Sequence, residues 1–591
     1  MPNLNRALLA TCAVISLGGL VSNRAFGQAY ERDKPKNPAP LSTPDQIQEP
    51  PRESDVLPDT KKVVVSRLAG IAFWDNPEKM HKDGVTLRAN GIWHDPSLDL
   101  LDTASFQSEI AKYLNKPLTL ADINSIVSKV SDLYRTHGRP FVYVAIPPQF
   151  LGSGVVHFVI MEYRLDKVSV NGNHWFSSEQ ISRMSGLRSG KILTLSDVRY
   201  GIERLNDNPF RTVNAVFSPS TEKGETNVLL QTTDRFPLNL YGTFDTGGLP
   251  TLGREEWEVG GTWGNVFGLG HTLSYQLTHS VSELYNSHSI NYSAPLPWGD
   301  QIHVFGSYAW NRPRETLNGT EFVENGHSGQ ASFRYVHDSH PIEVFGQKAT
   351  LWQQISAGFD YKTTNNSIEF GGISVYATNA ETVQFPVAYR LTLRDPFGET
   401  QLRNQATFSP GGLTDGNHRH SFSLLVPGAS PRYIYDTMTL ARTTWLPCDL
   451  SWTVQATGQI STTNLMYANQ IGLGGLYTTR GYFTDTILGS EGVTVANEVH
   501  SPAWHLLRDQ DLEQIGVFFD YGHVSQVRPI PNQVNSLDLS SVGLDLHLQE
   551  SSYVNLSFNI GWRLRSLPTV KRNEGYGNKG AFGNISITVG Y

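Results

Sequence analysis

The sequence has very little cysteine and, beyond its first residues, no long apolar run. Of its two cysteines, Cys12 lies in a segment that we expect to be removed on export. The mature chain would then keep only Cys448 and could form no intramolecular disulfide. After residue 30, no stretch has the roughly 18 consecutive apolar residues of a membrane-spanning helix. The sequence therefore excludes a helical membrane protein and leaves a soluble protein or a β-barrel.

Charged residues and methionine are also scarce. Charged residues make up 17% of the 591 positions and the net charge is −8, so the composition does not favour nucleic-acid binding. Six methionines stand against 53 glycines and an aromatic share of 11%, a balance that favours strands, turns and interfacial rings over a helical enzyme. We expect a mainly β protein with more than one domain, because the length exceeds that of one typical domain.

Residues 1–29 are typical of a signal peptide. Asn5-Arg6 gives a positive flank, Ala7 to Val21 an apolar core, and Ala25-Phe26-Gly27 or Gly27-Gln28-Ala29 a small-residue cleavage site. A membrane anchor is the weaker alternative, because the apolar run is shorter than the roughly 20 residues that span a bilayer. The mature protein therefore leaves the cytoplasm.

Residues 30–61 are rich in proline among charged and small polar residues, which blocks helix continuation and predicts a linker. From about residue 62 to 235, short strands alternate with amphipathic helices in two copies of one unit. Thr119-Leu120-Ala121-Asp122 opens a helix in the first copy, and Thr194-Leu195-Ser196-Asp197 opens one in the second. Two alternating apolar segments follow each helix. We expect two small strand-helix-helix-strand-strand modules; a single α+β domain with a chance repeat is the alternative.

From residue 236 to the end, the helical period gives way to alternating segments separated by turn residues. Even-numbered residues of 554–564 and of 542–548 are apolar, and the polar face of the second segment carries Asp545 and His547. A soluble sandwich would also alternate. However, segments of about ten residues match tilted membrane strands better than the shorter strands of globular proteins. This pattern predicts a barrel with lipid outside and water inside.

One long connection interrupts these segments, from about Asn469 to Val493. It contains Leu473-Gly474-Gly475 and then Arg480-Gly481-Tyr482. An unstructured connection of this length inside a compact protein usually has a function. Alone, however, Arg-Gly-Tyr could be an ordinary turn.

A second motif, Phe518-Phe519-Asp520-Tyr521-Gly522, lies on a predicted strand. Alternation turns Phe518, Asp520 and Gly522 toward the lumen. Asp520 is then a carboxylate held inside a barrel, where an arginine is a favourable partner.

Together, these features resemble the two-partner secretion transporters, the haemolysin-secretion branch of the outer-membrane assembly superfamily. In that family, a long extracellular loop folds back into the barrel and places an Arg-Gly-Tyr or Arg-Gly-Phe tip against a Phe-x-Asp-x-Gly strand. The matching residues are Arg480, Gly481 and Tyr482 at the loop tip and Phe518, Asp520 and Gly522 on the lumen strand.

The resemblance implies a mainly β fold in which a 16-stranded transmembrane β-barrel follows two small α+β POTRA domains. The barrel would occupy residues 236–591 and the POTRA domains residues 62–165 and 166–235. Three features depart from the family. Residues 66–106 are longer than the first POTRA domain usually needs, the Pro-rich 30–61 does not fit the family's lumen-plugging N-terminal helix, and the chain ends in Tyr591 instead of Phe.

The implied function is an outer-membrane pore, its POTRA domains in the periplasm, that recognises and secretes a large partner polypeptide without nucleotide hydrolysis. The partner would be adhesin-like or haemolysin-like. Other implied contacts are outer-membrane lipid and, during biogenesis, the barrel assembly machinery; we expect a monomer that binds no nucleic acid. The alternatives are a factor that inserts other outer-membrane proteins, which usually has more POTRA domains, and a passive porin, which would not need the repeats.

No catalytic motif fits the sequence well. We therefore expect that the protein is not an enzyme and binds neither a cofactor nor a metal. Residues 186–192 superficially resemble a phosphate loop, but the spacing is short and Ile192 replaces the required Ser or Thr. His418 and His420 flank Arg419 without other ligands nearby in sequence, which favours a solvated loop over a metal site.

Overall fold

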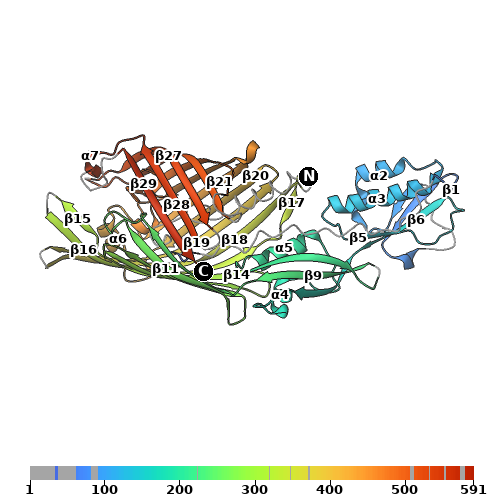
Figure 1. Ribbon diagram of the computed structural model, residues 1–591, viewed down its shortest axis with the longest axis horizontal. Helices are drawn as coiled ribbons and strands as arrows, with labels where there is room; N and C mark the ends of the chain where they lie inside the picture. Colours follow the sequence, from blue (N-terminus) through green and yellow to red (C-terminus); the bar gives the residue numbers. More distant parts are fainter. Residues whose placement is uncertain are drawn as a thin grey trace.

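The computed structural model describes the chain from residue 34 to 590 with gaps. The described residues are 34–36, 61–80, 91–222, 224–317, 320–345, 348–370, 373–505, 511–531, 533–550, 554–572 and 580–590. The predicted signal peptide, most of the Pro-rich segment and Tyr591 lie outside them. Two small α/β domains form one end of an elongated molecule, and a cylinder of strands forms the rest (Figure 1). No helix among the described residues is long and apolar enough to cross a membrane.

The first small domain, which we call domain 1, packs helices on one face of a four-stranded sheet of order β3-β2-β6-β5. Thr119 caps α3 through a capping box with Asp122, as the repeat predicted for a helix start. The buried face of α3 joins the sheet in one apolar core. The elements of domain 1 are β1 Val63–Val65, β2 Gly70–Trp74, η1 Pro77–Lys79, β3 Gly91–His94, η2 Asp99–Asp102, α2 Ala104–Ala111, β4 Leu118–Thr119, α3 Leu120–Thr136, β5 Val142–Ala145 and β6 Val155–Glu162.

The long stretch 66–106 includes one additional edge strand, β3. β3 pairs in parallel with β2, and β2 pairs in parallel with β6. On the sheet face opposite α3, Trp74 packs against Trp93 with ring centroids 4.4 Å apart and donates a hydrogen bond to His157. Both faces of this sheet are therefore covered, one by helices and one by aromatic side chains.

The second small domain, domain 2, repeats the helix start and packs two helices on a three-stranded sheet of order β7-β9-β8. The side chain of Thr194 caps α5 by accepting from the backbone of Asp197. Its elements are β7 Arg164–Asn171, α4 Ser178–Ser185, α5 Leu195–Asn206, β8 Arg211–Pro219 and β9 Glu225–Asp234. The two predicted modules are thus present, each around its own apolar core.

Beyond domain 2, antiparallel strands close into a 16-stranded barrel in which the last strand, β29, pairs with the first, β10. The short strands β15 and β17 extend this sheet. The barrel strands are β10 Leu238–Asp245, β11 Glu256–Val266, β12 His271–Ser280, β13 Tyr285–Pro295, β14 Gln301–Asn311, β15 Arg314–Leu317, β16 Thr320–Asp338, β17 Ile342–Val344, β18 Ala349–Phe370, β19 Ile373–Asp395, β20 Gly398–Pro410, β21 Arg432–Trp445, β22 Ser451–Ser461, β25 Glu491–His500, β26 Leu512–Ser525, β27 Ser536–Glu550, β28 Val554–Arg563 and β29 Ala581–Gly590.

The loops of the barrel carry short elements. These are α6 Arg419–Leu425, η3 Pro447–Asp449, η4 Tyr467–Asn469, β23 Ile471–Leu473, β24 Ile487–Gly489 and α7 Thr569–Lys571. His418 is the N-cap of α6, and His420 lies in its exposed first turn.

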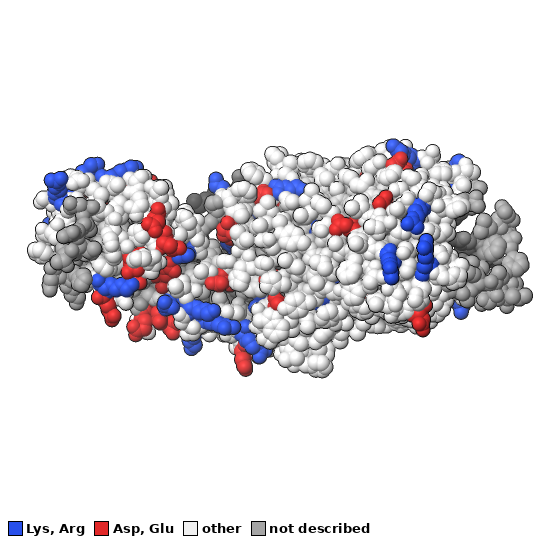
Figure 2. All heavy atoms as spheres, turned by 180° about the vertical axis from the view of Figure 1, so that it is seen from behind, with Lys and Arg blue, Asp and Glu red and all other residues white. Residues whose placement is uncertain are grey.

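Alternation along the strands separates a lipid-facing side from a lumen-facing side. On β26, Val517 is 51% exposed and Phe519 42%, whereas Phe518 and Asp520 are buried inside. Lys, Arg, Asp and Glu are sparse over the visible face of the barrel and gather over the small domains (Figure 2). This distribution is that of a barrel surrounded by lipid and attached domains surrounded by water.

The three described residues of the Pro-rich segment that precede the gap lie inside the barrel. The backbone of Lys36 donates to the hydroxyl of Tyr241, and its ammonium group donates to Thr243 and pairs with Glu258. These partners are on the inward faces of β10 and β11, whose outward residues, such as Trp257, are exposed. Part of the segment predicted as a linker therefore lies in the lumen.

Domain 2 packs against the turns at one end of the barrel. Asn208 donates to the Gly264 carbonyl over 2.6 Å, Ser196 to the Pro341 carbonyl over 3.0 Å and Tyr200 to the Asp338 carbonyl over 3.2 Å. By the resemblance above, this end is the expected periplasmic rim, and the opposite loops, including the one between β22 and β25, are expected to start on the outer side.

Glu203 on α5 lies in this interface and accepts a hydrogen bond from the indole of Trp352. Burial raises the pKa of Glu203 from its ordinary value of 4.5 to about 7, against the lowering effects of Trp352 and two arginines. Because the docked state favours the protonated carboxyl, docking is strongest at low pH and weakens as the pH rises from about 4.5 to about 7.

We therefore predict that domain 2 moves more freely against the barrel at about pH 8 than at about pH 5. Spin labels on the native Cys448, in a periplasmic turn, and on Ser189→Cys, in an exposed loop of domain 2, would report this as a broader distance distribution. Glu203→Gln should narrow the distribution at about pH 8 relative to the unaltered protein. Equal widths for the unaltered Glu203 protein at the two pH values would contradict the prediction.

Candidate functional site

The predicted loop enters the barrel from the outer side. β22 ends at Ser461 and β25 begins at Glu491, so the connection is 462–490 instead of 469–493. The difference arises because Glu491 and Gly492 are already paired to neighbouring strands although they lack the apolar alternation. The connection is also structured, which corrects the expectation of an unstructured one: β23 and β24 form a short hairpin. Three-residue strands are too short to show a period in sequence.

Arg480, near the turn of this hairpin, meets Asp520 on β26. Its Nε and Nη2 donate to the two carboxylate oxygens over 2.8 and 2.7 Å, and its backbone N–H donates over 3.0 Å. Asp520 is fully buried and Arg480 is 7% exposed. The three hydrogen bonds fix both the side chain and the backbone of the loop tip against the barrel wall.

Two further groups complete the surroundings of the Arg480 guanidinium. Nη1 lies 2.6 Å from a carboxylate oxygen of Glu498 on β25, and the guanidinium carbon lies 3.6 Å from the ring centroid of Phe518. The cation therefore sits on an aromatic face between two carboxylates from adjacent strands.

Gly481 allows the loop backbone to lie directly on the backbone of β28. Its φ is +88°, and a Cβ at this position would lie 2.8 Å from the Gly561 carbonyl oxygen. A Cβ on Gly561 would in turn lie 2.7 Å from the Gly481 nitrogen. The Gly481 carbonyl accepts a hydrogen bond from Arg563 over 2.7 Å. Two glycines facing each other therefore make this contact possible.

Tyr482 is fully buried on the far side of the tip. Its hydroxyl lies 2.7 Å from the Arg565 carbonyl and 3.0 Å from the Ser540 carbonyl, and the Arg563 guanidinium lies over its ring. It forms an apolar cluster with Leu473 and other buried residues. The remaining members of that cluster are Ile487, Val524, Leu539 and Leu567.

Glycines on the barrel strands provide the space for these groups. A Cβ on Gly522 would lie 2.4 Å from Leu473 of the hairpin, and a Cβ on Gly543 would lie 2.2 Å from the ring of Phe518. The glycine of the Phe-x-Asp-x-Gly strand thus receives the hairpin, and Gly543 lets the aromatic ring lie flat beneath Arg480.

The base of the loop contacts other strands of the barrel. Asn469 accepts from Lys362 on β18 over 2.9 Å and donates to Gln384 on β19 over 3.1 Å and to Tyr433 on β21 over 3.2 Å. The loop tip contacts β26, β27 and β28 instead. The loop therefore contacts two groups of strands that are not adjacent in the barrel and occupies part of the lumen between them.

The structure thus brings together all six residues of the two predicted motifs. Sequence reasoning missed Glu498 and Arg563, which hold the tip from either side. Glu498 lies on β25 beside Val499, and Arg563 lies on the polar face of the β28 segment. Both were visible as inward charges, but only the strand register shows that they face the same loop.

A model of one protein family matches this chain across the last strand of domain 2, β9, and most of the barrel. It is described as haemolysin secretion/activation protein ShlB/FhaC/HecB and matches residues 224–548, more than half of the chain. A model of the ShlB-type POTRA domain matches residues 95–162. The chain belongs to the haemolysin secretion/activation protein family.

Individual relatives agree with this assignment. The outer membrane transporter CdiB of Dickeya dadantii (strain 3937) is 24% identical over 475 residues, which are 76% of this chain and 78% of the relative. The heme/hemopexin transporter protein HuxB of Haemophilus influenzae (strain 86-028NP) is 21% identical over 463 residues, 76% of this chain and 79% of the relative. The solved structure of CdiB from Escherichia coli superposes with a TM-score of 0.72 at 17% identity and covers 94% of both chains.

Membership in this family makes the protein a two-partner secretion transporter of the outer membrane. Domains 1 and 2 are its POTRA domains and lie in the periplasm, and the barrel is the route by which a partner protein crosses.

Because the Gly481 and Gly561 backbones touch, we predict that Gly561→Ala displaces the loop tip. Amide hydrogen exchange in loop peptides spanning residues 471–489 should become at least about ten-fold faster, since the tip loses its close contact. Gly458→Ala on β22 is the matched control, because a Cβ there would meet no atom closer than 4.0 Å. Unchanged exchange in Gly561→Ala would contradict the prediction.

Proposed function

We propose that the ion pair between Arg480 and Asp520 holds the inserted hairpin in a conformation that the secretion pore needs. The observation that carries this proposal is the tip's position: Arg480 lies buried inside the barrel with two carboxylates around it. A partner chain must pass through the lumen that the loop partly fills. The way in which the loop is anchored therefore determines whether the partner can pass through the lumen.

The partner we propose is a large adhesin-like or haemolysin-like polypeptide that crosses the lumen in an extended form. No nucleotide hydrolysis or other catalysis is part of this proposal; folding of the partner outside the cell gives transport its direction. We also propose a monomer in contact with outer-membrane lipid and, during its own biogenesis, with the barrel assembly machinery. An assembly factor for other barrels is the less favoured alternative, since such factors usually carry more POTRA domains than the two that the described residues form before the barrel.

We predict that Arg480→Ala abolishes secretion of the partner while the barrel still assembles in the outer membrane. Removing one member of a buried pair leaves an uncompensated charge, at a cost on the order of 3–5 kcal/mol, which the loop avoids by leaving its site. Secretion is measured as partner in the culture medium, and assembly as heat-modifiable barrel in outer-membrane fractions.

Arg442→Ala is the matched control. Arg442 also makes a paired contact with an aspartate, Asp395, at 2.6 Å, but near a periplasmic turn and away from the loop. It should leave secretion near the unaltered level. Normal secretion by Arg480→Ala would overturn the proposed role of the pair.

We propose that the partner is recognised by strand addition to domain 2, at the outer edge of β7. The two edge strands of the domain 2 sheet, β7 and β8, are covered differently. On β8, both polar groups of the Asn206 side chain bond the backbone of Val213. On β7, the loop before α5 bonds only Leu165 and the Arg164 end, leaving residues 167–171 without a backbone partner on that side in the described chain. Main-chain pairing at such an edge tolerates many partner sequences.

This proposal predicts that a photo-crosslinking amino acid at Lys167 captures the partner during secretion. The same amino acid at Glu179, exposed on α4 of the same domain but away from the sheet edge, should capture little. Equal capture at the two positions would argue against strand addition at β7.

A further inference from the structure

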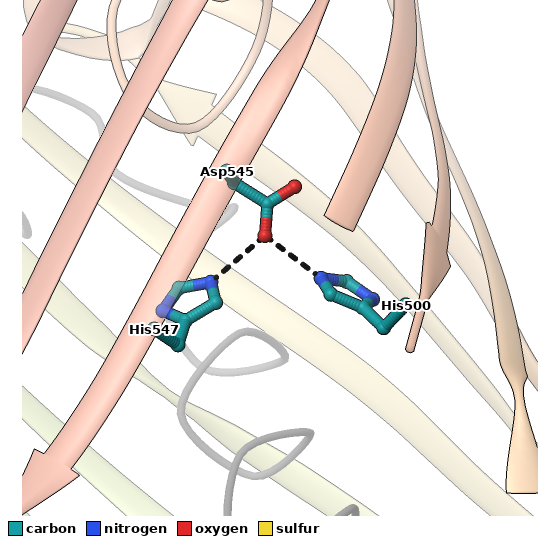
Figure 3. Close-up of side chains that lie close together, drawn as sticks. All are labelled: His500, Asp545 and His547. Atoms are coloured by element: carbon teal, nitrogen blue, oxygen red, sulfur yellow. Dashed lines mark hydrogen bonds and ion pairs between the residues drawn. The ribbon is translucent and has the colours of Figure 1, made fainter. Parts of the chain in front are cut away.

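Two histidines and an aspartate meet on the inner wall of the barrel, close to the Arg480 site (Figure 3). Nε2 of His500 lies 3.0 Å, and Nε2 of His547 lies 3.3 Å, from the same oxygen of Asp545. One potential ligand atom from each residue lies within 4.8 Å of the others. Asp545 and His547 project from the polar face of β27, and His500 ends β25.

Gly516 on the intervening strand makes this meeting possible. In the strand register, His500 pairs with Gly516 and Gly516 pairs with Asp545, so the three positions lie in one row across β25, β26 and β27. A Cβ on Gly516 would lie 2.3 Å from a carboxylate oxygen of Asp545. The carboxylate thus reaches across β26 to His500 because the residue between them has no side chain.

The cluster contains a buried carboxylate oxygen without a hydrogen-bond partner among the described residues. It is the second oxygen of Asp545, a residue that is 3% exposed. His500 also lies 3.9 Å from Glu498, whose other neighbour is Arg480. The carboxylates of Glu498 and Asp520 both pair with Arg480, and Asp545 lies in the neighbouring cluster, so three carboxylates gather here and favour a bound cation.

We propose that His500, Asp545 and His547 bind a divalent transition-metal ion of the zinc class. Two imidazole nitrogens and a carboxylate oxygen are ligands that Zn²⁺, Co²⁺ and Ni²⁺ accept, and ligand atoms around tetrahedral zinc lie roughly 3.4 Å apart. Small side-chain rotations bring the three atoms to that spacing. His547 remains partly exposed to the lumen, which leaves a fourth position for water.

A bound ion would connect β25 to β27 across β26, the strand that carries Asp520. It would also add positive charge near Glu498, which lies 3.9 Å from His500. The site is therefore adjacent to the loop anchor but does not use any residue of the two loop motifs.

The test uses the full-length protein in detergent, purified with a tag that contains no histidine and stripped with a chelator. Titration with ZnCl₂ should show one ion per chain, and Co²⁺ should give the visible absorption of a low-coordinate site. His547→Gln and Asp545→Asn should each weaken Zn²⁺ binding at least about ten-fold, because each removes one of three ligands. Zn²⁺ should raise the Tm of the unaltered protein and leave that of His547→Gln unchanged.

His523→Gln is the matched control. His523 pairs with one aspartate, Asp538, at 2.8 Å, and belongs to no three-ligand group found among the described residues. It should bind Zn²⁺ as the unaltered protein does. Absence of stoichiometric Zn²⁺ binding, or equal binding by His547→Gln, would overturn the proposal and leave a hydrogen-bonded His-Asp-His group. If Asp545→Asn fails to assemble, His547→Gln decides the question, because its ring is partly exposed.

Discussion

A guanidinium removed from water must keep its counter-charges, and in this transporter that requirement determines where the long loop lies. Arg480 is almost completely buried, and both of its carboxylate partners are provided by the barrel wall. The loop tip is therefore stable inside the lumen only where Asp520 and Glu498 can reach it. The other contacts of the tip, including the buried Tyr482, depend on that placement.

Glycines on the inner wall of the barrel are the second requirement for this placement of the loop. The loop, an aromatic ring and a carboxylate each lie against a position where a side chain would collide: Gly561, Gly543 and Gly516. Outward residues of the same strands are large and apolar, as lipid contact requires. The inner wall is thus shaped by residues that contribute no side chain, and this shape admits the polar groups that the loop needs.

Much of this organisation could be predicted from local patterns. The repeated Thr-x-x-Asp starts identified both long POTRA helices, and period-two alternation placed Asp520 inside and Phe519 outside. These features depend on neighbouring residues in the sequence, so the sequence displays them directly.

What could not be predicted depends on register between distant strands. Glu498, Arg563 and His500 each look like ordinary inward polar residues until the strand pairing places them opposite a loop or a neighbour. The short hairpin β23–β24 has no periodicity to reveal it. The additional strand β3 was also missed by the sequence prediction, because four residues that pair in parallel at a sheet edge show little hydrophobic periodicity.

The role of the Arg480–Asp520 ion pair is tested most directly by measuring the accessibility of the loop tip in a double-mutant cycle. In a Cys448→Ser background, a cysteine replacing the fully buried Thr479 is labelled with a thiol reagent in intact membranes. If one ion pair holds the tip, Arg480→Ala and Asp520→Ala each speed labelling, and the double variant is labelled no faster than either single variant. Labelling rates that stay unchanged in the single variants, or effects that multiply in the double variant, would contradict the account.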